Sequence, residues 1–343
     1  MAKLIVRITL LSLLILGVCL LAGGQGTTNG TIGPLDWPEP AMENRPGCYW
    51  WWPGSAVDKE NITWNLETMR AAGMGGATIV PIYGVKGYED RYIQHLTPEW
   101  VDMMSHAARE ARRLGMWVDM TTGTGWPFGG PMISDGDSDA IVVYENGVLS
   151  HQFSGRMVKR AAPGGEGKAI NPYSARAMSE YLQHFDRAFA GSDVVLPRAM
   201  YHDSFEFKGN WSKDFPQEFR KRRGYDLADH LTTLFGEGEA ETVGRIKSDY
   251  RETLSDLHLE YLQTWVSWSQ SHGCTTRNQA HGAPANLLDL YAASGIPETE
   301  TFGATAFKIP GIRRRADNIR QVDNPQPLIN RMASSAAHVT GKA

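Results

Sequence analysis

The sequence predicts an α/β fold of the (β/α)8 TIM-barrel type. Apolar strands alternate with amphipathic helices along the chain, which is typical of a parallel sheet, and side chains suited to chemistry recur where the predicted strands end. A barrel brings the carboxyl ends of all its strands to one face, whereas an open doubly wound sheet binds ligand mainly at one switch point. No Gly-x-Gly-x-x-Gly dinucleotide loop follows the first predicted strand, and this also favours the barrel.

The first part of the chain alternates strands and helices in order. The continuous apolar run Ala77–Tyr83 indicates a parallel strand that is covered on both faces. The helix Pro98–Leu114 has Thr97 as its cap and proline at its first position. The other elements predicted here are the strands Cys48–Trp52 and Met116–Met120, the helix Asp58–Ala72 and the glycine-rich loop Thr121–Gly130.

The second part begins with residues 131–170, where Gly, Ser and Asp indicate an elaborated loop or insertion. Further helices are predicted at Ser174–Ala190, 214–272, Leu287–Ala293 and Leu328–Val339, and further strands at Ala199–His202 and Thr275–Gln279, with a sixth strand or its loop at Thr299–Ala304. These elements make about six strand–helix units, whereas a closed barrel needs eight. We therefore expect residues 46–343 to form a barrel domain that is incomplete at its C-terminus.

The N-terminus has the pattern of an export signal. Lys3 and Arg7 precede the apolar run Ile8–Ala22, which is too short to predict a spanning helix. We expect residues 1–24 to be a cleaved signal peptide and residues 25–45 a linker, so that the mature protein is periplasmic or secreted and has no integral membrane segment. Cys48 and Cys274 would remain, and two cysteines predict no disulfide framework.

Composition narrows the class of partner. A hydrophobic content of 42% and a charged content of 21% are typical of a globular protein. The net charge of -4 gives no reason to expect nucleic acid, because phosphate binding needs a concentrated basic face. The chain has 11 Trp, and indole rings serve both as core residues and as platforms for sugar rings.

Two acidic runs, Tyr201–Glu206 and Ile296–Glu300, each stand where a predicted strand opens into a loop. Cleavage of a glycosidic bond uses two carboxyl groups, one protonated to supply the leaving oxygen with a proton and one ionised to activate water or attack carbon. Glu206 is the candidate in the first run. In the second run we expect at most one of Glu298 and Glu300 to face the barrel mouth, and we favour Glu300. The pattern predicts a glycoside hydrolase.

With these residues in place, the chain resembles the N-terminal catalytic region of glycoside hydrolase family 106, the α-L-rhamnosidases. The resemblance covers nearly the whole mature chain in order. The matching stretches are Arg45–Gly54, Met69–Gly76, Ala111–Gly115, Gly123–Pro131, Val158–Gly167, His202–Glu206, Arg222–Leu227, Asp249–Asp256, Thr276–Gly282, Leu287–Tyr291, Ile296–Gly303 and Ser334–Lys342.

The resemblance implies a barrel, an inverting mechanism and a calcium ion in the sugar subsite. It also implies that Glu206 is the general acid and that a glutamate of the Ile296–Glu300 run is the base. We accordingly expect an exported α-L-rhamnosidase that removes terminal rhamnose from glycans. Members of this family are much longer than this chain, so an inactive fragment remains an alternative.

Further residues are candidates for binding. Trp52 and Trp126 are the predicted aromatic platforms, and Asn278 and His281 offer polar groups that suit a polyol. Asp203 would bind the expected calcium or orient Glu206. Two alternatives stay open: a metal-dependent hydrolase or deacetylase with His202, Asp203 and His281 as ligands, and a non-catalytic remnant that binds sugar. Against the first, the sequence lacks the His spacing of known zinc sites.

Overall fold

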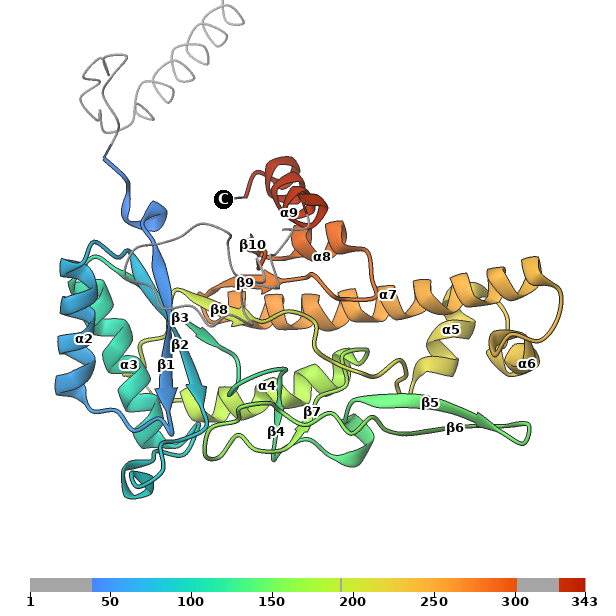
Figure 1. Cartoon of the computed structure of the whole chain (residues 1–343), viewed down its shortest axis with the longest axis horizontal. Coiled ribbons are helices and arrows are strands. Elements are labelled where there is room, and N and C mark those ends of the chain that lie inside the picture. The colour runs from blue at the N-terminus through green and yellow to red at the C-terminus, as the bar shows by residue number, and fades with distance from the viewer. Residues whose placement is uncertain (1–38, 192, 301–326, 343) are drawn as a thin grey trace, which may run out of the picture. The chain divides into compact units, whose positions relative to one another are not determined.

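A parallel sheet of six strands lies at the centre of the fold (Figure 1). In this computed structural model the described residues are 39–191, 193–300 and 327–342, and one compact unit begins at Met42. The predicted signal peptide and the linker up to residue 38 lie outside the described residues. The strands, in the order in which they pair, are β1 (Gly47–Pro53), β2 (Gly76–Ile82), β3 (Trp117–Thr121), β8 (Ala199–His202), β9 (Thr275–Gln279) and β10 (Ile296–Glu298).

The helices follow the same order as the strands. Helices α2 and α3 contact each other, as do α3 and α4, α4 and α7, α7 and α8, and α8 and α9. Strands added in one direction by right-handed crossovers place their helices on one face, which is how a (β/α) barrel is wound, whereas a doubly wound sheet reverses direction. These helices are α2 (Lys59–Ala71), α3 (Pro98–Arg113), α4 (Ala175–Phe189), α7 (Ala240–Ser271), α8 (Leu287–Ala293) and α9 (Pro327–Thr340).

The sheet is strongly curved. The Gln279 amide on β9 donates to the Tyr49 hydroxyl on β1 over 3.3 Å. Neighbouring strands lie about 4.8 Å apart, so β1 and β9, with three strands between them, would be about 19 Å apart in a flat sheet. The parallel sheet is therefore confirmed and it curls in the manner of a barrel wall. Closure is not observed, because within the described residues no pairing joins β1 to β10.

The two faces of the sheet differ in polarity, as the alternation of a strand requires. Trp50 and Trp52 of β1 point toward the helices, where they join a core with Ile62, Leu66 and Trp100. The opposite, concave face carries polar and aromatic side chains, which are Tyr49, Thr78, Asp119, Tyr201, Arg277 and Glu298. One face of the sheet thus supplies stability and the other presents chemistry.

The last strand lies just before the segment Thr299–Ala304, which was predicted as a sixth strand or its loop. β10 ends at Glu298, Thr299 and Glu300 are not in a strand, and residues 301–304 lie outside the described residues. The register of β10 is set by its neighbour, since Ile296 pairs with Arg277 and Glu298 with Gln279. Partners on β9 thus determine where the last strand forms.

The segment between β3 and α4 is an insertion with structure of its own. The predicted loop at 131–170 contains the antiparallel hairpin β5 (Ala140–Glu145) and β6 (Val148–Phe153). The hairpin lies toward one end of α7 (Figure 1), and a second apolar core there includes Trp211, Phe215 and Tyr250. The remaining elements are β4 (Gly129–Gly130), β7 (Lys168–Ala169), α5 (Phe215–Arg223), α6 (Leu231–Leu234), η1 (Met42–Asn44), η2 (Glu89–Arg91), η3 (Asp135–Asp137) and η4 (Leu227–His230).

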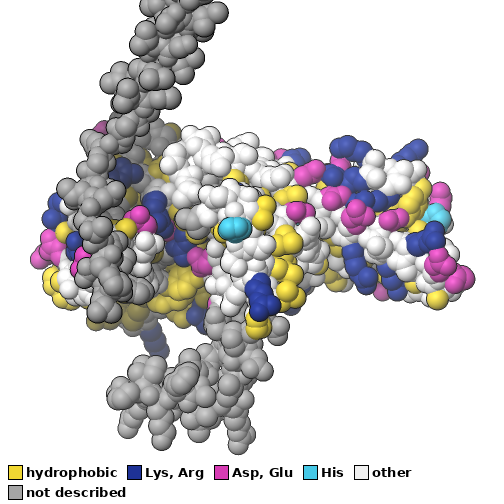
Figure 2. Space-filling model, turned by 90° about the horizontal axis from the view of Figure 1, so that it is seen from above, with side chains coloured by type: hydrophobic (Ala, Val, Ile, Leu, Met, Phe, Trp, Pro, Cys, Tyr) yellow, Lys and Arg dark blue, Asp and Glu magenta, His cyan; other side chains and the backbone are white. Residues whose placement is uncertain are grey.

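Charges of both signs are interspersed over the surface near this end of α7 (Figure 2). Arg222 pairs with Glu218 at 2.9 Å and with Glu260 at 2.7 Å, which ties α5 to α7. Mixed charge of this kind is typical of a solvated surface rather than of a phosphate-binding face. None of the helices in the described ranges has both the length and the apolar character needed to cross a membrane.

Candidate active site at the carboxyl ends of the strands

A pocket of about 340 Å³ lies where the strands end. It brings together carboxylates from the two acidic runs, Asp203 and Glu206 after β8 and Glu300 after β10. The full lining is Tyr49, Trp51, Val80, Thr121, Gly125, Trp126, Arg160, Tyr201, Asp203, Ser204, Glu206 and Glu300. Segments far apart in sequence thus meet at the face where barrel enzymes perform chemistry.

Glu206 forms an ion pair with Lys159, a residue of the insertion. The Glu206 side chain lines the pocket and is 27% exposed, whereas that of Lys159 is 42% exposed and is not part of the lining. A neighbouring cation favours the ionised form of a carboxylate. The pKa of Lys159 is itself lowered, first by burial and then by the nearby Arg156 and Arg160 guanidinium groups. Lys159 was not predicted to belong to the site.

The backbone around Lys159 is held against the glycine-rich loop. The Lys159 N–H donates to the Trp126 carbonyl at 2.7 Å, and the Trp126 N–H donates to the Lys159 carbonyl at 3.1 Å. Gly125 allows this approach, because a Cβ at Gly125 would lie 1.9 Å from the Lys159 carbonyl oxygen and the residue has φ +49°. The loop and the insertion therefore form one wall of the pocket.

Glu300 and Glu298 have different surroundings. Glu300 lines the pocket, is 42% exposed and has its Oε2 4.0 Å from His281 Nε2. Burial raises the pKa of Glu300, and the charges of Asp203 and Glu298 raise it further. Glu298 does not line the pocket and forms an ion pair with Arg277 at 2.5 Å. Glu298 is the last residue of β10, whereas Glu300 lies beyond the strand end, and this difference in position separates the two carboxylates.

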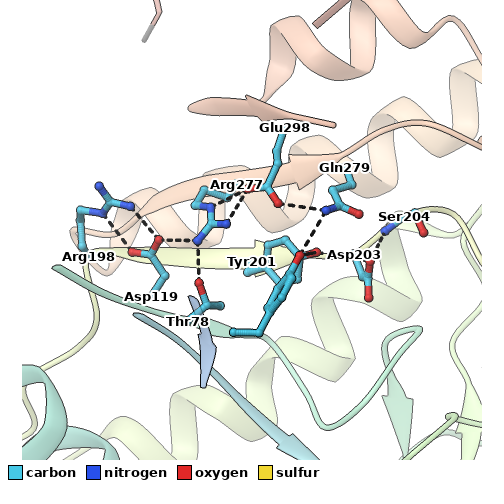
Figure 3. A network of polar contacts seen from close by, with 10 residues as sticks. Thr78, Asp119, Arg198, Tyr201, Asp203, Ser204, Arg277, Gln279 and Glu298 are labelled. Atoms are coloured by element: carbon cyan, nitrogen blue, oxygen red, sulfur yellow. Dashed lines mark hydrogen bonds and ion pairs between the residues drawn. The ribbon is translucent and has the colours of Figure 1, made fainter. Parts of the chain in front are cut away.

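Beneath the pocket runs a polar network that crosses the concave face (Figure 3). Asp119, which is fully buried, accepts from Arg198 at 2.7 Å and from Arg277 at 2.8 Å. Arg277 also donates to Thr78 at 2.7 Å and to Glu298, whose other oxygen accepts from Gln279 at 2.9 Å. Buried charges of this kind are stable only when paired and hydrogen-bonded, and each member here has partners.

The network ends at Asp203 on the pocket side. The hydroxyls of Tyr49 and Tyr201 lie 2.8 Å apart, and Tyr201 donates to Asp203 Oδ1 at 3.3 Å. The Ser204 N–H donates to the same oxygen at 2.7 Å. Burial raises the pKa of Asp203 and these hydrogen bonds oppose the rise, with a smaller increase from the charge of Glu298. Asp203 is thus fixed in orientation at the floor of the pocket.

Of the two predicted aromatic platforms, Trp126 and Trp52, only Trp126 lies at the pocket. Trp126 lines the pocket, but Trp52 has no exposed surface and packs in the core against Trp50 and Trp100 at ring distances of 5.5 and 6.4 Å. A ring with both faces covered offers no platform for a sugar. Trp51 has the position that we expected of Trp52, because it is 41% exposed, lines the pocket and has its ring centre 6.1 Å from that of Trp126.

The predictions for polar residues on and just after β9 are also partly corrected. Asn278 is buried and does not line the pocket, because Arg277 and Gln279 on either side of it point to the concave face. His281 is 4% exposed and stands beside Glu300, and burial lowers its pKa. Gln279 makes the concave-face contacts that we expected of Asn278.

Within ranges 39–191, 193–300 and 327–342, no three His, Cys, Asp or Glu side chains are placed to hold a metal ion. His202, proposed as a ligand in the zinc alternative, is buried, with Nδ1 2.7 Å from the Asp203 carbonyl oxygen and its ring against Phe128 and Trp265. The zinc alternative thus has no such cluster within the described residues. Calcium also takes carbonyl, amide and water oxygens, so a calcium ion with Asp203 as a ligand stays a prediction.

The singly wound parallel sheet, with carboxylates and tryptophans around one pocket at the strand ends, is the architecture of a glycoside hydrolase. The sequence profile of glycoside hydrolase family 106, described as α-L-rhamnosidase, matches residues 38–166 and 148–343. The chain belongs to this family.

Two relatives illustrate the extent of the similarity. The rhamnosidase structure from Novosphingobium sp. PP1Y superposes with a TM-score of 0.61 at 14% identity and covers 75% of this chain. A curated protein from Formosa agariphila, which bears a provisional β-glucuronidase name, is 28% identical over 130 residues, or 38% of this chain. The chain spans 48% of the first relative and 11% of the second. At these identities the structural likeness shows the fold alone.

Proposed function

We propose that this protein is an inverting α-L-rhamnosidase that removes terminal rhamnose from glycans. The observation that carries the proposal is that Glu206 and Glu300, which come from distant parts of the chain, line one pocket with Trp51 and Trp126. The pocket volume of about 340 Å³ is within the range of sites for small ligands. Membership in the rhamnosidase family supports the choice of sugar.

In this proposal Glu206 protonates the glycosidic oxygen as the bond to the anomeric carbon breaks. Glu300 takes a proton from the water that attacks the opposite face of the sugar, and the product has inverted configuration. The raised pKa of Glu300 brings this base nearer to neutral pH, where general bases are most effective. Trp51 and Trp126 would bind the sugar ring, and Asp203 would accept a hydrogen bond from one of its hydroxyls.

The ion pair between Lys159 and Glu206 sets a condition on these roles. Glu206 can donate a proton only if substrate binding separates it from Lys159, because the ion pair keeps it ionised. If the pair persists, Glu206 would act as the base, and Glu300, with its raised pKa, would act as the acid. The leaving group distinguishes the two assignments, since a good leaving group does not need protonation.

The test uses two aryl or alkyl rhamnosides of different leaving-group acidity. We expect Glu206→Gln to retain hydrolysis of 2,4-dinitrophenyl α-L-rhamnoside and to lose about 10²- to 10⁴-fold on the methyl glycoside. Glu300→Gln should lose activity on both to a similar degree. The opposite pattern would exchange the two roles, and wild-type rates in both variants would refute the pair. NMR of the first product should show the β-anomer, and an α-anomer would exclude inversion.

We also propose that the protein is exported, on the basis of the N-terminal pattern of Lys3, Arg7 and the apolar run Ile8–Ala22. Expression of the full chain with a C-terminal tag, followed by N-terminal sequencing of the periplasmic fraction, should show a new N-terminus near residue 25. A chain that keeps Met1 and stays in the cytoplasm would contradict export.

A further inference from the structure

We propose that Arg160 selects substrates in which the sugar released with the glycosidic oxygen carries an anionic group, either the carboxylate of a uronic acid or a sulfate ester. The inference rests on the proposed function, because it takes Glu206 as the group that protonates the leaving sugar. It goes beyond that function by specifying the chemistry next to the rhamnose.

The first observation is the position of the Arg160 guanidinium. It lines the same pocket as Glu206 and Glu300, and its central carbon lies 4.9 Å from the centre of the Trp126 ring. A cation–π contact with an indole restrains the position of the guanidinium while its N–H groups remain available to a ligand. The residue is exposed, so these groups face solvent or ligand.

The second observation is charge. Both neighbouring cations lie over the Trp126 ring, but Lys159 also forms an ion pair with Glu206. Within the described residues no carboxylate forms an ion pair with Arg160. An arginine that lines a polar pocket without an acidic partner is suited to bind a carboxylate or sulfate through two parallel N–H bonds.

The third observation is the fixed backbone. Arg160 has φ +56°, a left-handed conformation that is uncommon for residues other than glycine. The Tyr83 N–H donates to the Arg160 carbonyl at 3.0 Å, and the bridge between Lys159 and Trp126 holds the preceding residue. Unfavourable backbone conformations persist where surrounding contacts determine them and are concentrated at ligand sites.

The side of the pocket follows from Lys159. Lys159 Nζ, which pairs with Glu206, lies 6.0 Å from the centre of the Trp126 ring, and the Arg160 guanidinium carbon lies 4.9 Å from the centre of the same ring, so Arg160 lies near the Glu206 side of the pocket. The proton donor of a glycosidase faces the leaving group. The guanidinium is therefore placed to meet a substituent of the leaving sugar.

The test compares matched disaccharides with the full chain. Each set has α-L-rhamnose linked 1→2, 1→3 or 1→4 to glucuronic acid, to glucose or to glucose 6-sulfate, and 2,4-dinitrophenyl α-L-rhamnoside serves as the neutral reference. We expect kcat/KM for an anionic member to exceed that for its glucose counterpart about 10-fold or more, as charge-assisted hydrogen bonds allow. A preference for glucuronate identifies the carboxylate as the ligand, and a preference for the sulfate identifies the ester.

Arg160→Gln should bring the ratio of anionic to neutral kcat/KM toward one. The matched control is Arg245→Gln, which removes the same charge from a side chain on α7 that is 76% exposed, and it should leave the ratio as in wild type. The preference should also shrink at 0.5 M NaCl, because salt screens exposed charges.

The outcomes separate the two proposals. If wild type does not cleave the aryl rhamnoside, the proposed function fails and this inference fails with it. If the aryl rhamnoside is cleaved but the anionic disaccharides react no faster than the glucose ones, or not at all, the role of Arg160 alone is refuted. A ratio that Arg160→Gln leaves unchanged refutes it as well.

Discussion

Replacement of Arg277 by methionine tests whether the polar network of the concave face stabilises the fold. Arg277 is 13% exposed and bonds to Thr78, Asp119 and Glu298 from one guanidinium. Removing one partner of a buried ion pair costs about 3–5 kcal/mol, because the remaining charge is left uncompensated. Asp119 keeps Arg198, so we expect a loss near the lower limit, about 3 kcal/mol.

The assay is urea unfolding followed by tryptophan fluorescence, for which the chain has 11 reporters. Arg245→Met on the exposed surface of α7 is the control and should change the free energy of unfolding by less than about 0.5 kcal/mol. The double variant Arg277→Met, Glu298→Gln should lose at least about 1 kcal/mol less than the two single losses added together, because no unpaired charge then remains on β10.

Two results would refute this reasoning. A loss below about 1 kcal/mol for Arg277→Met would mean that water or other groups compensate the two carboxylates as well as Arg277 does. Strictly additive losses in the double variant would mean that Arg277 and Glu298 do not depend on each other, contrary to their ion pair.

Three further predictions concern neighbouring tryptophans, a buried histidine and a glycine. Trp52→Ala should destabilise the fold by about 3–5 kcal/mol, because its ring is fully buried. Trp51→Ala should mainly raise KM for an aryl rhamnoside. The reverse result would contradict the assignment of Trp52 to the core and Trp51 to the pocket. Burial lowers the pKa of His258 to about 4. The unfolded chain therefore binds more protons below about pH 6.5, and stability should fall from there toward pH 4 by up to about 3 kcal/mol for this residue. Urea midpoints from pH 7.5 to 4.5 should show the fall, and His258→Gln should reduce it; an equal slope in both proteins would be inconsistent with the prediction. Gly125→Ala should destabilise the fold by about 1–3 kcal/mol and lower activity, because a Cβ would collide with the Lys159 carbonyl. The control Gly136→Ala should have little effect, because nothing lies within 4 Å of a Cβ there. Equal effects of the two substitutions would contradict the role of Gly125 in the close contact with Lys159.

Local patterns predicted the elements well where their residues had one clear environment. The strands Ala199–His202 and Thr275–Gln279 and the helix Leu287–Ala293 are confirmed with the same bounds. Apolar periodicity is a local property, so the sequence is enough to locate such elements. The bounds of β10, Ile296–Glu298, were not predicted, because its position depends on partners on β9, which no local pattern encodes.

The site was predictable only in part for the same reason. Strand alternation indicates that Trp51 and Trp52 face opposite sides, but it does not reveal which side the helices cover. The role of Lys159 depends on contact with Glu206, and that of Arg160 on contact with Trp126. Both cations lie in a segment that we interpreted as a loop, although the run Val158–Gly167 was already among the stretches that resemble the family.

The strand order bears on how the protein folds. Each strand of the central sheet pairs with the one synthesised before it, so the sheet can grow in step with the emerging chain. The bond from Arg277 to Thr78 spans 199 positions and can form only after most of the sheet exists. Substitution of Arg277 should therefore accelerate unfolding more than it slows refolding. The concave-face network would form late in folding and stabilise a sheet that has already assembled.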